Sequence, residues 1–195
     1  MMDYEDYTPD FTKDRQAAAE WARRVLADPQ VCILDTETTG LGSDAEIIQL
    51  AVLAPDGTVV FESLFRPAGP IPPAATNVHG ITDAAVAGAP TFAAQHAALC
   101  AALAGKLIIV WNAEYDSRLL DQTCRRYNLP LPACAGWDCA MLKQAQYAGD
   151  WSSYFGSYRW QKLEWACEGT GVMPDHTAAG DCRATLAVIR AMAAS

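Results

Sequence analysis

We expect neither a membrane segment nor a secretion signal in the 195-residue sequence. No apolar run approaches the roughly 20 residues that a membrane-spanning helix needs, so no membrane partner is expected. The N-terminus, Met1 to Asp6, is acidic and contains neither the basic nor the apolar region of a signal peptide. We therefore expect a cytoplasmic protein.

Cysteine pairs are also missing. The seven cysteines form an odd set with no CxxC pair, which disfavours both a disulfide scaffold and a cysteine zinc site. Cys32 lies in an apolar run, and Cys100 and Cys182 lie in expected helices. These positions indicate buried, reduced thiols.

Positive charge is scarce, because 14 lysines and arginines face 23 acidic residues and the net charge is −9. This charge argues against a protein held on duplex DNA by a broad basic face, since such binding rests on many phosphate contacts. An enzyme that grips a few nucleotides is compatible with this charge, because bound cations invert the local charge of a carboxylate site.

The hydrophobic pattern predicts an α/β fold with a mixed sheet flanked by helices. We expect a polar N-terminal arm and a helix (residues 15–27) within residues 1–28, and one domain over residues 29–195. Three antiparallel strands are expected first, the last two joined by the turn Pro55-Asp56-Gly57. The expected strands are 31–36, 46–54, 58–65, 106–111 and 133–138. The expected helices are 74–78, 82–87, 91–104, 113–127, one ending near 147, 160–168 and 178–193, with an aromatic loop over 149–158.

A pair of acids ends the first apolar strand. Asp35 and Glu37 are two residues apart, so their side chains project from the same face. Two like charges this close raise each other's pKa unless a cation lies between them. Because carboxylate oxygens suit Mg²⁺ or Mn²⁺, the pair predicts a metal-dependent enzyme.

Three further residues could complete such a site. Asp116 stands in the first turn after a strand, and His176 precedes Asp181 by five residues at the start of the last helix. Each has an ordinary alternative: an acid favoured near a helix N-terminus, or a surface histidine. Asp35 and Glu37 could likewise be a mere strand-end pair. The joint pattern favours a single cavity that gathers four carboxylates and one histidine.

Three segments resemble the motifs of the DEDDh (DnaQ-like) 3'–5' exonuclease family: Asp35–Leu41, Asn112–Asp116 and His176–Asp181. Val78–Asp83 and Lys162–Cys167 resemble further stretches of that family, which includes ribonuclease T, oligoribonuclease and the proofreading subunit of bacterial DNA polymerase III. The resemblance covers about residues 30–193 and implies a ribonuclease H-like fold.

The resemblance also implies a mechanism, in which phosphodiester bonds are hydrolysed at 3' ends of single-stranded or short nucleic acid. Two divalent ions, Mg²⁺ or Mn²⁺, would lie about 4 Å apart. Asp35, Glu37 and Asp181 would hold one ion, Asp35 would bridge to the second, and Asp116 would act through water. His176 would be the general base, a role that an imidazole suits near neutral pH.

Substrate contacts implied by the resemblance are less specific. Leu41 matches the family's wedge position, whereas Trp111 stands where many members carry histidine, which changes the pocket beside the second motif. The aromatic loop with Trp160 either stacks on bases or covers the core. Arg159 and Lys162 either meet phosphates or are solvated. The expected substrate-binding residues are Thr38, Thr39, Gly40, Leu41, His79 and Asn112.

We expect DNA to be favoured over RNA, with a DNA polymerase or repair protein as a partner. The acidic charge favours a distributive enzyme. Three alternatives stay open: a 3'–5' exoribonuclease, a ribonuclease H-like binding module without catalysis, and a phosphatase acting on small nucleotides.

Overall fold

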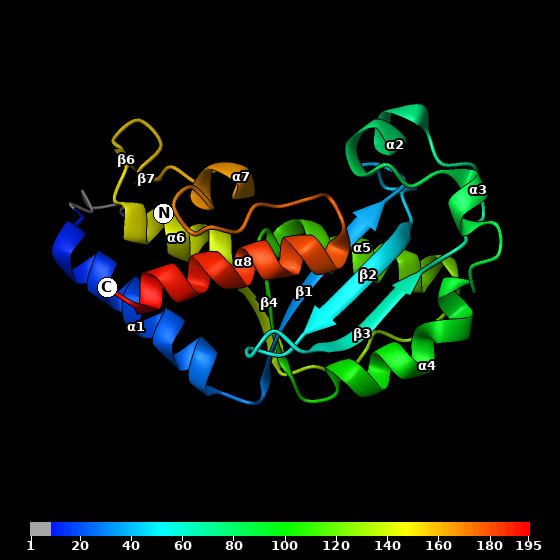
Figure 1. Ribbon diagram of the computed structural model, residues 1–195, viewed down its shortest axis with the longest axis horizontal. Coiled ribbons are helices and arrows are strands. Elements are labelled where there is room, and N and C mark those ends of the chain that lie inside the picture. The colour runs from blue at the N-terminus through cyan, green and yellow to red at the C-terminus, as the bar shows by residue number, and fades with distance from the viewer. Residues whose placement is uncertain (1–8) are drawn as a thin grey trace, which may run out of the picture.

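The computed structural model of the chain describes residues 9–195, so residues 1–8 of the expected arm lie outside it. A five-stranded sheet with the order β3-β2-β1-β4-β5 forms its centre (Figure 1). The first three strands are antiparallel, and β4 and β5 run parallel to β1. The strands are β1 (Val31–Thr38), β2 (Ile47–Leu53), β3 (Val59–Leu64), β4 (Leu107–Val110) and β5 (Gly136–Cys139).

Helices cover both faces of this sheet (Figure 1), which confirms the predicted α/β class with a mixed sheet. The long helices are α1 (Phe11–Ala27), α4 (Phe92–Leu103), α5 (Ala113–Arg126), α6 (Ala140–Ala148) and α8 (Ala178–Ala193). The short helices are α2 (Pro73–His79), α3 (Asp83–Val86) and α7 (Leu163–Ala166). In residues 9–195, none of these helices is both long enough and apolar enough to span a membrane.

Alternation along β1 divides the core into two layers. Ile33 packs with residues of α1, α6 and α8, whereas Leu34 packs with residues of α4 and α5. Successive strand side chains point to opposite faces, so Asp35 continues the α8 face and Thr36 continues the α5 face. This alternation between the two faces of the sheet therefore determines which helix each side chain at the end of the strand can contact.

Most element boundaries agree with the predicted ones within two residues, but four segments differ. The expected strand over 133–138 begins later, as β5 (Gly136–Cys139). Helix α1 begins at Phe11 rather than at residue 15, because the Asp10 side chain caps it and accepts a hydrogen bond from the Lys13 backbone N–H (3.1 Å). The expected helix over 160–168 is reduced to α7, since Lys162 has an extended backbone.

The cysteines are free thiols, but Cys100 is only half-buried, so its expected burial is wrong.

The expected aromatic loop contains a second, two-stranded sheet, β6 (Trp151–Ser152) paired with β7 (Ser157–Tyr158). Trp151 and Tyr158 are directly opposed across this hairpin, with ring centroids 5.1 Å apart in an edge-on arrangement. Cross-strand aromatic pairs stabilise sheets. Part of the aromatic loop is therefore structural.

Candidate active site

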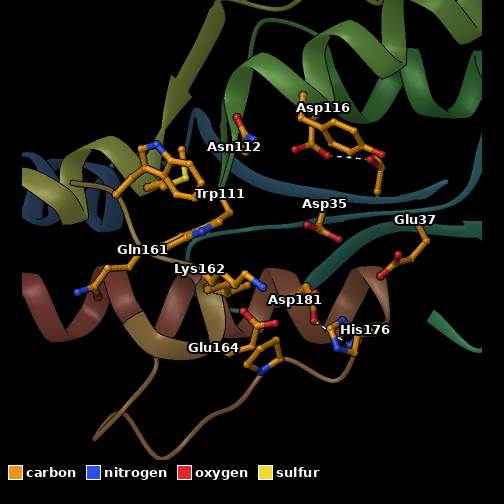
Figure 2. A pocket seen from close by; sticks show the side chains of 16 residues that line it. Asp35, Glu37, Trp111, Asn112, Asp116, Gln161, Lys162, Glu164, His176 and Asp181 are labelled. Atoms are coloured by element: carbon orange, nitrogen blue, oxygen red, sulfur yellow. Dashed lines mark hydrogen bonds between the residues drawn. The ribbon is translucent and has the colours of Figure 1, made fainter. Parts of the chain in front are cut away.

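Three carboxylates converge at the carboxyl end of β1. Asp35 and Glu37 project from the strand toward the first turn of α8, where they meet Asp181 (Figure 2). Each of the three offers one oxygen, and these oxygens all lie within 4.8 Å of one another. The start of α8 is held in place because the Gln49 side chain on β2 accepts the backbone N–H of Ala178 at 3.1 Å.

Asp116 approaches the same cavity from the opposite layer. It lies in the first turn of α5 and is buried, and its carboxylate accepts a hydrogen bond of 2.7 Å from the Thr36 hydroxyl. Asp116 lines a cavity of about 310 Å³, and the same cavity is lined by Asp35, Glu37, His176 and Asp181. The structure thus brings together all five residues expected to be catalytic.

The four acids are held in an environment that disfavours their charged forms. Burial raises the pKa of Asp35 well above its usual range, and the charges of Asp116, Asp181 and Glu37 add to this shift. Burial, then Asp181 and Asp116, raise the pKa of Glu37 to about 8. Burial raises the pKa of Asp116 to about 7, although the hydrogen bond from Thr36 lowers it. Burial also raises the pKa of Asp181, although hydrogen bonds from two backbone N–H groups lower it.

This donor set fits a hard divalent cation. Neither of the salt bridges found in residues 9–195 involves the four acids. Converging carboxylate oxygens are the ligands that Mg²⁺ and Mn²⁺ prefer. A cation bound by Asp35, Glu37 and Asp181 would favour their charged forms and so lower the pKa values that the neighbouring acids raise.

The loop before α8 positions His176. One carboxylate oxygen of Asp181 accepts the backbone N–H groups of Asp175 and His176, each at 3.1 Å. His176 adopts a left-handed backbone conformation (φ 58°), which is uncommon for a residue other than glycine and is found where surrounding structure imposes it. Its half-buried side chain lines the cavity beside Asp181 (Figure 2).

Gly180 allows this loop to lie against α8. The Asp175 side chain accepts hydrogen bonds from the backbone N–H and the hydroxyl of Thr177 (3.0 and 2.7 Å), and it lies directly over Gly180. A Cβ atom at position 180 would overlap the Asp175 carboxylate. The glycine is therefore required for the observed loop conformation.

A second cavity, of about 500 Å³, adjoins the acids on the side of α2. The Nδ1 atom of His79 accepts the backbone N–H of Ile81 (3.0 Å), so Nε2 carries the proton and donates to the carbonyl oxygen of Thr38 (3.2 Å). The hydroxyls of Thr38 and Tyr115 lie 2.7 Å apart. Five of the six expected substrate-binding residues line this cavity: Thr38, Thr39, Gly40, Leu41 and His79.

The sixth expected substrate-binding residue, Asn112, is exposed and lines the catalytic cavity together with Trp111. The indole N–H of Trp111 is buried and has no hydrogen-bond partner among the described residues. The lining residues that were not predicted include Thr36, which stands between the two acids of β1, and Tyr115; both of them line both cavities. Tyr115 directly precedes Asp116 in the sequence, and this position next to an expected catalytic residue could have indicated its place in the site.

Comparisons with known proteins agree with this geometry. A sequence model of the RNase T family, described as exonuclease, matches residues 32–189. The uncharacterized exonuclease CP81 of Escherichia phage 186 is 38% identical over 180 residues, which cover 88% of this chain and 92% of that protein.

Solved structures share the fold. Exonuclease X in complex with 5' overhanging duplex DNA is 25% identical, with a TM-score of 0.59 over 83% of this chain and 90% of that one. The nuclease domain of 3'hExo, a DEDDh family member bound to rAMP, is 19% identical, with a TM-score of 0.61 over 82% of this chain and 90% of that one. The expected ribonuclease H-like fold is thereby confirmed. The chain belongs to the DnaQ-like exonuclease family.

Proposed function

We propose that the chain is a metal-dependent 3'–5' exonuclease that removes nucleotides from single-stranded or short nucleic acid. The observation that carries this proposal is the convergence of Asp35, Glu37 and Asp181 within 4.8 Å, with Asp116 and His176 lining the same cavity. Such a set is costly to hold without a cation, because each acid is at least partly buried beside others. We further propose residues 29–195 as the exonuclease domain.

Two divalent ions, Mg²⁺ or Mn²⁺, are proposed as cofactors. Asp35, Glu37 and Asp181 would hold one, and Asp35 with Asp116 would hold the other. When bound, the ions supply charge neutralisation at the attacking and leaving oxygens of an in-line displacement. The fit rests on the hard oxygen donors and on their raised pKa values.

The chain's own residues would do the rest of the chemistry. His176 takes a proton from the attacking water, for which its place beside Asp181 at the cavity wall is suitable. Asp181 fixes the backbone of His176 through the 3.1 Å hydrogen bond, and so orients the base. Thr36 keeps the Asp116 carboxylate directed into the site. General-base assistance of this kind contributes about 10²–10⁴ in rate.

The cavity beside α2 would hold the terminal nucleoside. Leu41, 79% exposed, stands at its rim and would contact the terminal base, while Thr38, Thr39, Gly40 and His79 would contact the sugar or base. Asn112 would contact the substrate in the catalytic cavity. DNA is proposed over RNA because exonuclease X, which is similar to this chain, is described in complex with DNA.

The test is digestion of a 5'-labelled single strand with Mg²⁺ or Mn²⁺, on matched DNA and RNA. We expect a ladder of shortened products from wild type and none from Asp35→Asn, with DNA shortened faster. Uniform cleavage within the strand or the same products from Asp35→Asn would contradict the proposal. Faster trimming of RNA would favour the exoribonuclease. Release of phosphate from mononucleotides alone would favour the phosphatase, and binding without cleavage would favour the non-catalytic module.

A further inference from the structure

The two cavities lie on opposite sides of the catalytic acids. Thr36, Glu37 and Tyr115 line both, but one cavity extends toward α2 and the other toward the segment leading into α7. Figure 1 shows α2 and α7 on opposite sides of the end of β1. If the terminal nucleoside occupies the α2 side, as in the proposed function on which this inference rests, the remaining strand leaves on the α7 side.

An exposed aromatic side chain stands on that side. Trp160 lines the catalytic cavity, yet 60% of its surface is exposed. It differs from Trp151 and Tyr158 of the neighbouring hairpin, whose rings pack against each other. An indole at the rim of a nucleic-acid cavity offers a flat surface on which a base of any type can stack.

A cation stands two residues further on. Lys162 is the one lysine or arginine among the described residues that line the catalytic cavity, and Figure 2 shows its side chain extending into that cavity. No salt bridge is found for it in residues 9–195, and its Nζ atom lies 6.0 Å from the ring centroid of Trp165. In an acidic chain, this charge is suited to a backbone phosphate.

The backbone presents both side chains to the same opening. Residues 159–162 have no helical structure, and Lys162 has φ −67° and ψ 153°. Helix α7 then begins with Leu163, whose buried side chain anchors the segment in the core. An extended segment fixed at one end can track a strand in a way that the expected helix over 160–168 could not.

We propose that Trp160 and Lys162 hold the nucleic-acid strand on the 5' side of the scissile bond, with a base stacked on the Trp160 indole and a phosphate beside Lys162. The site takes single-stranded nucleic acid of any sequence, because stacking and phosphate contact do not read base edges. It determines the preference for strand length rather than the chemistry of cleavage.

The first test is binding of a fluorescently labelled octathymidylate, measured by anisotropy in Ca²⁺. Trp160→Ala weakens binding by about 5- to 150-fold, the factor that one base–aromatic stack supplies. Trp160→Phe, which keeps a ring, restores most of the affinity. Lys162→Gln reduces the slope of log K against log salt by about 0.7, as expected for one lost phosphate contact. Unchanged affinity in Trp160→Ala would overturn the proposal.

Tyr154→Ala is the matched control, because Tyr154 is 88% exposed on the hairpin but does not line the catalytic cavity. The second test compares the octamer with the p-nitrophenyl ester of thymidine 5'-monophosphate, which has no strand on the 5' side. The ratio of kcat/KM for octamer over ester falls in Trp160→Ala and stays constant in Tyr154→Ala. An equal fall in kcat/KM for both substrates in Trp160→Ala would overturn the proposal. A wild-type protein that cleaves neither substrate would contradict the proposed function alone, because the binding test of this proposal does not require cleavage.

Discussion

Thr36 and Asp116 are joined by a 2.7 Å hydrogen bond between side chains that lie 80 residues apart in the sequence. Thr36 points away from the face of β1 that carries Asp35 and Glu37, and it meets Asp116 on the far side. One strand therefore provides acids on one face and orients another acid on the other face. The hydrogen bond lowers the pKa of Asp116, which burial raises to about 7.

Removal of the Thr36 hydroxyl should make the enzyme more sensitive to acid. In Thr36→Val the pKa of Asp116 rises further, so less carboxylate is present near neutral pH. A hydrogen bond to a charged group is worth about 1.5–3 kcal/mol, which corresponds to a shift of about one pH unit or more in the acidic limb of the pH–rate profile. Thr36→Ser keeps the hydroxyl and serves as the control. An acidic limb that does not move would exclude this role for Thr36.

The metal-free protein should become less stable as the pH rises. Because the folded-state pKa of Glu37 is raised from 4.5 to about 8, the native state binds more protons than the unfolded state within that window. Its free energy of unfolding therefore decreases from about pH 4.5 to about pH 8. Thermal unfolding in chelator measures this directly. Mg²⁺ should restore the lost stability most at the upper end of the window, and Glu37→Gln should flatten the metal-free pH dependence.

Replacement of His176 should separate turnover from binding. We expect His176→Ala to lose about 10²–10⁴ in kcat, since only proton transfer is removed. Metal affinity and substrate KM should stay close to wild type, because the backbone N–H that Asp181 accepts is retained. Single-turnover kinetics and metal titration check the two parts. An unchanged kcat would exclude His176 as the general base.

The left-handed backbone at position 176 gives a separate stability prediction. His176→Gly should be more stable than His176→Ala by about 1 kcal/mol, because glycine adopts φ near 58° without the Cβ penalty. Chemical denaturation of the two variants in the same buffer measures the difference. Equal stability would mean that the loop relaxes in both.

Gly180→Ala should disturb the same loop from the helix side. The added methyl group overlaps the Asp175 carboxylate, so the loop must shift and carry His176 with it. We expect kcat to fall while α8 stays folded, since alanine favours a helix. The double variant Gly180→Ala/Asp175→Ala removes the overlapping group and should recover part of the loss, which a double-mutant cycle quantifies. Strictly additive losses would contradict this account.

Much of the fold could be predicted because local signals agree with tertiary structure. Thr91 caps α4, Thr177 caps α8, and the apolar residues of β1 that precede the acids are all buried. The four acids and the histidine expected together do line one cavity. Their catalytic roles remain a proposal.

The rest depends on contacts that a linear pattern does not reveal. Trp151 and Tyr158 form a hairpin because they pair across it, and Lys162 adopts an extended backbone where helical propensity favours a longer helix. The hydrogen bond from Thr36 to Asp116 joins segments whose proximity follows only from the parallel pairing of β1 and β4. Sequence spacing could not show which aromatics are exposed.

The alternation of β1 has a consequence for changes in chain length. Deletion of one residue between Val31 and Leu34 would exchange the faces of every later side chain in the strand, placing the carboxylates toward α5 and Thr36 toward α8. A core substitution in the same segment can be absorbed by repacking. Substitutions in this strand should therefore be tolerated far more often than insertions or deletions, which would inactivate the enzyme even where the hydrophobic core is preserved.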